Sequence, residues 1–167
     1  MIEAGKQLPA GQLSEYLTEP GEGCSIGPNR FEVQERLKGK KVVIFGLPGA
    51  FTPTCSAKHL PGYLAEIEQF RAKGVDEVWC FAVNDAFVMH AWGEQQGASG
   101  KVAMIADGSA DYTRALGLEL DLAAHGMGLR CKRFAMIVED GVVRSVDVEA
   151  PGQFTVSDAT SQLARLG

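Results

Sequence analysis

Residues 41–59 have the sequence KVVIFGLPGAFTPTCSAKH, and this stretch decides the expected fold. Its first seven residues form a β-branched, apolar run that Pro48-Gly49 ends, which is typical of a strand buried on both faces. Apolar residues at helical spacing follow, up to a stop at Gly74. These residues are Leu60, Tyr63, Leu64, Ile67 and Phe70. The stretch therefore predicts a strand, a stiff loop and a helix, in that order.

Two further pairs of strand and helix follow. Residues 77–83 predict a second buried strand, and residues 102–106 predict a third, before a short helix that ends at Gly117. The candidate helix caps are Asn84 or Asp85 after the second strand and Asp107 or Ser109 after the third. The helix after the second strand is expected to bury one face made of Phe87, Val88, Ala91 and Trp92.

The C-terminal third has a different pattern. Beyond a glycine-rich stretch at 117–129, apolar runs at 133–138 and 142–148 flank an Asp-Gly pair at 140–141, which is a strong signal for a β-hairpin. Ser157 is positioned to cap a last helix. Strand–helix repeats followed by a hairpin and a helix predict an α/β protein with a thioredoxin-like fold, a mixed β-sheet with helices on both faces.

Length and composition limit the classes of protein to which the chain can belong. Its 167 residues fit a single domain, residues 1–167, and 46% hydrophobic with 22% charged residues is typical of a globular protein. The net charge of −5 argues against a general binder of nucleic acid or anionic membranes. No apolar run approaches the ~20 residues of a membrane span, and the first residues do not resemble a secretory signal. We therefore expect a cytoplasmic protein.

Four cysteines stand at positions 24, 55, 80 and 131. No two of them have CxxC spacing, which argues against a zinc ribbon and against a dithiol redox motif. We therefore expect no metal and no cofactor. Cys55 is informative because it follows a buried strand at the start of a helix. Ligands bind at this place in open α/β sheets, and free backbone amides there favour a thiolate. Position alone leaves both a reactive thiol and an inert buried thiol open.

The residues around Cys55 carry a family resemblance. Pro48-xxx-Thr52-xx-Cys55 resembles the PxxxTxxC signature of peroxiredoxins. The segments that are similar to the type 5 (plant type II) subfamily are residues 46–56, 59–62, 83–89 and 133–136. The resemblance extends over about residues 35–166, which is nearly the whole chain.

This resemblance implies an activity and a set of site residues. The activity is thiol-dependent reduction of hydrogen peroxide and alkyl hydroperoxides. Cys55 would be the peroxidatic cysteine, Thr52 would hydrogen-bond the sulfur and the peroxide, and Pro48 would shield the site from water. Arg133 would hold the thiolate and the peroxide oxygens.

Ionisation of the thiol cannot be the main source of the rate. Complete ionisation raises the thiolate fraction at neutral pH only on the order of ten-fold, and a more acidic thiol is a weaker nucleophile. The larger share must come from donors aimed at the oxygens where charge develops. The candidate donors are the Thr52 hydroxyl, the Cys55 amide and the Arg133 guanidinium.

The oxidised cysteine must be reduced again. The resemblance implies that Cys80, 25 residues beyond Cys55, is the resolving cysteine of the plant-type group, and a passive core cysteine is the alternative. Cys131 is a second candidate, whereas Cys24 is expected in an exposed loop without a role. A disulfide needs Cα atoms within about 7 Å. We therefore expect the Cys55 turn to unwind, with Pro61-Gly62 separating it from the long helix.

The resemblance also implies partners. Glutathione, glutaredoxin or thioredoxin is the expected reductant, and would attack Cys55 directly if no cysteine of the chain resolves it. A homodimer is implied, with Phe51 and Phe87 as candidate interface residues. Two other functions stay open: a non-enzymatic redox sensor that relays oxidation to a partner, and a thioredoxin-like disulfide reductase, which the missing CxxC weakens.

The histidines and tryptophans suggest no other chemistry. His59 shares a helical face with the reactive cysteine, which would allow a Cys–His hydrolase, but we expect it at the helix surface or at an interface. His90 and His125 lack partners at metal-ligand spacing. Trp79 and Trp92 are expected in the core or at an interface.

Overall fold

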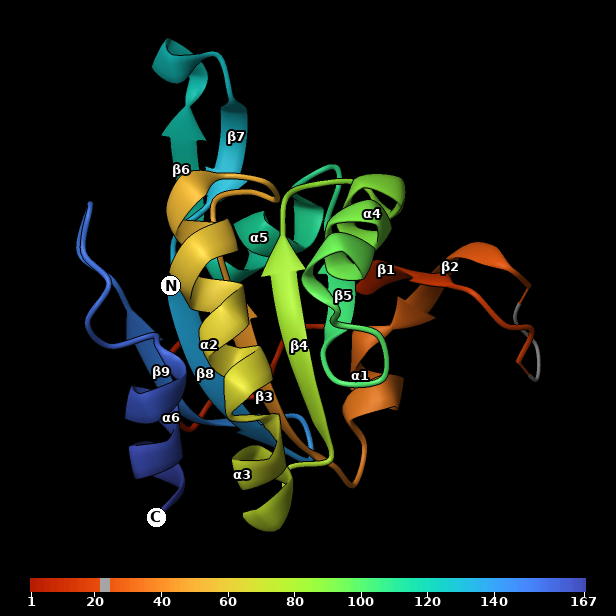
Figure 1. Ribbon diagram of the computed structural model, residues 1–167. Coiled ribbons are helices and arrows are strands. Elements are labelled where there is room, and N and C mark those ends of the chain that lie inside the picture. The colour runs from red at the N-terminus through yellow and green to blue at the C-terminus, as the bar shows by residue number, and fades with distance from the viewer. Residues whose placement is uncertain (22–24) are drawn as a thin grey trace.

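The computed structural model describes residues 1–21 and 25–167, so the prediction for Cys24 lies outside the described residues. Its centre is a seven-stranded sheet with the order β2-β1-β5-β4-β3-β8-β9 (Figure 1). The strands of this sheet are β1 (Gln12–Leu17), β2 (Gly27–Glu32), β3 (Lys41–Gly46), β4 (Glu77–Ala82), β5 (Ala103–Ala106), β8 (Phe134–Glu139) and β9 (Val142–Val148). The helices are α1 (Val33–Leu37), α2 (Leu60–Ala65), α3 (Ile67–Ala72), α4 (Ala86–Gln96), α5 (Asp111–Leu116) and α6 (Ala159–Leu166).

The sheet is mixed, as predicted. β3, β4 and β5 are parallel, whereas β8 lies antiparallel to β3 and β9 antiparallel to β8. The predicted hairpin joins β8 and β9 through Asp140 and Gly141, whose φ angles of 50° and 79° are those of a tight hairpin turn.

Helices cover both faces of the sheet, which confirms the thioredoxin-like plan. On β3, Val43 and Phe45 point into one hydrophobic cluster, together with residues of α2, α3, α4 and α6. Val42 and Ile44 point into a second cluster, together with residues of α1 and α5. Figure 1 shows α2, α4 and α6 in front of the sheet. The central strand is therefore buried on both faces, because each face has its own apolar core.

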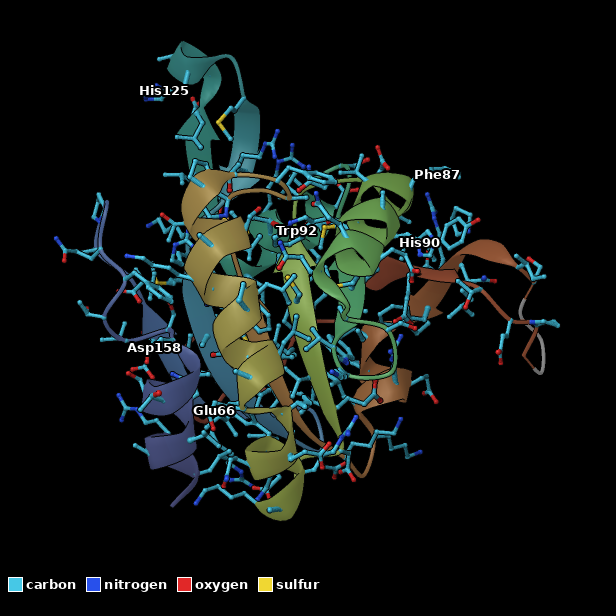
Figure 2. All side chains as sticks on the ribbon, in the orientation of Figure 1. Glu66, Phe87, His90, Trp92, His125 and Asp158 are labelled. Carbon is cyan, nitrogen blue, oxygen red and sulfur yellow. The ribbon has the colours of Figure 1, made fainter. Side chains whose placement is uncertain are left out.

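Two of the predicted helices differ from the sequence-based expectation. The helix expected up to Gly74 is broken at Glu66, whose φ of −105° and ψ of 11° separate α2 from α3. In α4 the buried residues are Ala86, Met89, Trp92 and Gly93. Of the predicted inner face, Trp92 is buried and Val88 packs half-buried against the core, whereas Phe87 and Ala91 are exposed. Phe87 is 64% exposed, and Figure 2 shows it pointing away from the sheet.

The structure also identifies which of the candidate residues cap the helices. Asp85 caps α4 by accepting a hydrogen bond from the Val88 amide. Asp158, and not Ser157, caps α6, because the Asp158 carboxylate accepts from the Ser161 amide. Asp107 accepts from two amides of α5 without being its N-cap residue.

The glycine-rich stretch contains a second hairpin that the sequence analysis did not predict. Its strands are β6 (Glu119–Leu122) and β7 (Gly128–Cys131), joined through the 3-10 turn η2 (Ala123–His125). The hairpin projects beyond one end of the central strands, with His125 at its tip (Figures 1 and 2). In the part of the chain that the structure describes, no helix is long and apolar enough to cross a bilayer.

Candidate active site

Cys55 follows the carboxyl end of β3, beyond a connection formed by residues 47–54. It is the first residue of η1 (Cys55–His59), a π-helical turn that continues directly into α2. The Cys55 side chain is completely buried and belongs to the same hydrophobic cluster as Phe45 and Tyr63. Pro61-Gly62 lies within α2, so it does not separate the Cys55 turn from the helix, as the sequence analysis had expected.

Strand register brings Arg133 to Cys55. β8 pairs with β3 so that Phe134 lies opposite Gly46, the last residue of β3. Arg133 therefore stands beside the connection that leads to Cys55. Its Nη2 donates a hydrogen bond to the Cys55 sulfur over 3.3 Å, and its side chain is half-buried. A permanently charged, planar donor thus contacts the buried thiol directly.

Thr52 and Pro48 lie in the connection, half-buried. The Thr52 hydroxyl donates to the carbonyl of Gly49 over 2.7 Å, so its hydrogen is not directed at the Cys55 sulfur in this state. The Pro48 carbonyl accepts a hydrogen bond from Nη1 of Arg130 over 3.2 Å. The connection is therefore held by one hydrogen bond within it and by another from Arg130 of β7.

Several supporting residues were missed by the sequence analysis. Asn84, considered only as a helix cap, accepts a hydrogen bond from the Ala50 amide over 2.9 Å. From α4, Trp92 Nε1 donates a hydrogen bond to the Ser56 hydroxyl over 3.1 Å, and Gln96 Nε2 donates one to the Ser56 carbonyl over 3.2 Å. The position of Asn84, two residues beyond the end of β4, was the available signal, because side chains at strand ends meet the neighbouring loop.

His59 is buried, so the expected surface or interface position was wrong. Its ring is 0% exposed, and it packs against Phe154 with 5.0 Å between ring centroids. Nη1 of Arg133 lies 2.8 Å from His59 Nδ1, and the Ser157 carbonyl lies 3.1 Å from His59 Nε2. The C-terminal segment therefore covers His59, through Phe154 and Ser157.

Glu149 holds this covering segment in place. Its carboxylate accepts hydrogen bonds from the backbone amides of Thr155, Val156 and Ser157, and from the Ser157 hydroxyl at 2.7 Å. Burial alone would raise the pKa of Glu149, but these hydrogen bonds lower it to about 2. The Glu149 amide also donates to the Arg133 carbonyl, so the same residue is tied to the strand end that carries Arg133.

Cys80 and Cys131 are both free, completely buried thiols. Cys80, in β4, points into the cluster that contains Cys55, and burial together with the nearby Cys55 raises the pKa of its thiol well above the usual range. Cys131 points to the opposite face, where its sulfur lies 3.1 Å from the Leu47 carbonyl, and burial raises its pKa to about 12. Neither is a reactive thiolate in this conformation.

Other features of the described residues add no further chemistry to this site. Both tryptophans belong to the core, since Trp79 and Trp92 are completely buried. Over residues 1–21 and 25–167, no group of three or more His, Cys, Asp or Glu side chains is placed to hold a metal ion.

Comparison with known proteins identifies the family of the chain. The redoxin family model matches residues 3–163. Peroxiredoxin-2B of Arabidopsis thaliana is 53% identical over 165 residues, which cover 99% of this chain and 98% of that protein. Reduced Prx3 of Vibrio vulnificus in complex with H₂O₂ superposes with a TM-score of 0.93 at 50% identity, with all of both chains covered. A Burkholderia cenocepacia protein provisionally described as a thioredoxin reductase has a TM-score of 0.96 and 58% identity over 98% of this chain and 97% of its own.

The chain therefore belongs to the redoxin family, and it has the fold of the peroxiredoxin structures that it matches. Within that family it is a peroxiredoxin of the plant type II subfamily, and hence a thiol peroxidase, an oxidoreductase. The sequence-based resemblance is confirmed at the level of family, fold and activity.

Proposed function

We propose that Cys55 is the peroxidatic cysteine and that Arg133, Thr52 and Pro48 complete its site. The hydrogen bond of 3.3 Å from Arg133 to the Cys55 sulfur carries this proposal. A guanidinium at that place stabilises a thiolate and stays charged throughout the reaction. Cys80 and Cys131 have no such partner among the described residues, and their buried thiols have raised pKa values.

The first step consumes one hydroperoxide. The Cys55 thiolate attacks the terminal peroxide oxygen, an S–O bond forms and the O–O bond breaks. The sulfur loses two electrons and becomes a sulfenic acid, while the leaving oxygen gains them and takes up a proton to give water or an alcohol. Negative charge moves from the sulfur to the leaving oxygen, and the fixed donors of Arg133 lie beside this path.

Thr52 contributes an acceptor in this proposal. Because its hydroxyl hydrogen is committed to the Gly49 carbonyl, the lone pairs of its oxygen are free to accept from the protonated peroxide oxygen. Such a contact would orient the peroxide towards the sulfur. The hydrogen bond from Arg130 to the Pro48 carbonyl supports a shielding role for Pro48, since it holds the connection over the thiol.

The sulfenic acid is resolved by Cys80 in this proposal. The Cys80 thiol attacks the Cys55 sulfur, a disulfide forms and water leaves. Both thiols point into one hydrophobic cluster, on the same face of the sheet, whereas Cys131 points to the other face. Both are fully buried, so η1 must unwind for the two sulfurs to meet.

Mass spectrometry after one equivalent of hydrogen peroxide tests this step. The expected product is a Cys55–Cys80 disulfide, which Cys80→Ser abolishes and which the matched variant Cys131→Ser retains. A persistent sulfenic acid in the unmodified protein, or disulfides between chains alone, would contradict resolution by Cys80.

The remaining expectations concern partners and location. The exposed side chains of Phe51 (52%) and Phe87 (64%) support a homodimer, and free, buried cysteines suit the reducing cytoplasm. A coupled assay tests activity and reductant together, by comparing thioredoxin with glutathione and glutaredoxin and hydrogen peroxide with an alkyl hydroperoxide. Turnover of many equivalents is expected, whereas a redox sensor would stop after about one.

A further inference from the structure

His59 is enclosed between the active-site helix and the C-terminal segment. Its ring is completely buried, with 4.9 Å between its centroid and that of Phe45 and 5.0 Å to that of Phe154. Both ring nitrogens have a polar partner: Arg133 Nη1 at Nδ1 and the Ser157 carbonyl at Nε2. The ring is therefore an element of the polar network around Cys55.

The two partners determine where the ring carries its hydrogen. A guanidinium has only donors, so Nδ1 must offer its lone pair to Arg133. A carbonyl has only lone pairs, so Nε2 must carry the hydrogen that it donates to Ser157. His59 is thus neutral, with its hydrogen on Nε2, and its one basic nitrogen is already occupied.

We propose that His59 is a positioning residue of the peroxidase reaction, which holds the Arg133 guanidinium on the Cys55 sulfur by accepting a hydrogen bond at Nδ1. This proposal rests on the role given to Arg133 above. The guanidinium is a rigid planar fork, so fixing Nη1 at 2.8 Å from His59 fixes the direction of Nη2, which lies 3.3 Å from the sulfur. Cys55 and His59 both belong to η1, so a single helical turn contacts both terminal nitrogens of the guanidinium.

A neutral acceptor suits this task better than a carboxylate. A carboxylate at the same place would also orient Arg133, but its charge would offset the positive field that the guanidinium exerts on the thiolate. Burial and the adjacent Arg133 lower the pKa of His59 to about 3, which keeps the ring neutral at physiological pH. The charged or titratable groups around the ring are Arg133, Glu149, Cys55 and Tyr63.

A matched pair of variants separates the two hydrogen bonds of the ring. An Asn side chain places an acceptor near the position of Nδ1, whereas a Gln side chain places its donor near that of Nε2. We expect His59→Asn to oxidise Cys55 at a rate within about three-fold of the unmodified protein, and His59→Gln to be slower by on the order of ten-fold, because the guanidinium loses its holder. We also expect the pH profile of Cys55 alkylation to move to higher pH in His59→Gln alone.

Tyr63→Phe is the control for stability. The Tyr63 hydroxyl donates to the same Ser157 carbonyl over 2.7 Å but does not touch Arg133, so its loss should lower the melting temperature without slowing peroxide reduction. Equal rates in His59→Asn and His59→Gln, or a rate loss in all three variants that follows their melting temperatures, would overturn the proposal.

A measurement on the unmodified protein keeps the test decisive if the variants do not fold. Nitrogen-15 NMR of labelled histidine should show His59 with its hydrogen on Nε2 and no titration between pH 5 and pH 9. A hydrogen on Nδ1, or titration in this range, would overturn the inference. If Arg133→Lys is slow while His59→Gln is not, the positioning role alone has failed. If Arg133→Lys reacts like the unmodified protein, the proposed site itself has failed.

Discussion

Nη2 of Arg133 lies 3.3 Å from the Cys55 sulfur, although the two residues are 78 positions apart in the chain. The contact depends on the pairing of β8 with β3, which sets Phe134 opposite Gly46 and leaves Arg133 beside the active-site connection. The same guanidinium reaches His59 with its other terminal nitrogen. The electrostatics of the thiol therefore depend on the register of two central strands.

Arg133→Lys should lower the rate of Cys55 oxidation by on the order of ten- to a hundred-fold while the fold is retained. A lysine keeps the charge but, as a point donor on a flexible stem, it cannot hold His59 and Cys55 in one plane. Stopped-flow measurement of peroxide consumption checks this. Arg144→Lys, on an exposed pair with Glu139, is the control and should react like the unmodified protein.

Thr52→Val should slow peroxide reduction by more than about ten-fold, because it keeps the volume of the side chain but removes the oxygen that would orient the peroxide. Thr52→Ser keeps the hydroxyl and should retain most of the activity. The two second-order rate constants with hydrogen peroxide decide the matter. Similar rates in Thr52→Val and the unmodified protein would exclude Thr52 from the reaction.

Glu149→Gln should cost up to about 3 kcal/mol of unfolding free energy near neutral pH, since the pKa of Glu149 is lowered from 4.5 to about 2. A group with a lowered folded-state pKa stabilises the protein above its unfolded pKa, here about 4.5, and that stability is lost as the pH falls towards 2. The difference between the two proteins should therefore shrink between about pH 4.5 and pH 2.

Denaturant titrations at several pH values measure this difference. Glu68→Gln, which breaks only an exposed pair with Arg71, should change stability little at any pH. A difference between Glu149→Gln and the unmodified protein that does not vary with pH would show that the charge of Glu149 is not what holds the segment.

Gly46→Ala should destabilise the protein by at least about 1–3 kcal/mol. A Cβ at this position would lie 2.1 Å from Cε1 of Phe134, whose completely buried ring has no room to retreat. Gly62→Ala is the matched control, because nothing lies within 4 Å of its added Cβ and the residue is inside α2. Thermal unfolding should show a lower Tm for Gly46→Ala. Gly62→Ala should have an unchanged or higher Tm, because alanine in a helix stabilises the protein by up to about 1 kcal/mol relative to glycine.

Partial rescue would identify the cause. Gly46→Ala combined with Phe134→Leu should recover part of the lost stability, because the smaller side chain makes room for the added methyl group. If the double variant is as unstable as the sum of the two single ones, contact with the Phe134 ring is not the cause.

Local sequence patterns were sufficient for the central elements. The apolar runs at 41–47 and 77–83 predict strands, and the Asp-Gly pair at 140–141 predicts the hairpin, because each pattern acts over a few neighbouring residues. The position of Cys55 after a buried strand predicts a reactive cysteine, and the motif around it indicated the family, which the comparisons confirm. The helix break at Glu66 has no comparable signal in the sequence.

The sequence by itself determined the central strands β3, β4, β5, β8 and β9, their order and the family, and it predicted the reactive cysteine. Only the tertiary structure decided what surrounds the cysteine: that His59 is buried, that it meets Arg133, and that Glu149 fastens the segment above them. The physical reason is that these contacts join residues that are not neighbours in the chain. The hydrogen bond between His59 and Arg133, which are 74 positions apart, depends on strand register, and the burial of His59 depends on the path of the covering loop. Neither is encoded in the few residues next to each group.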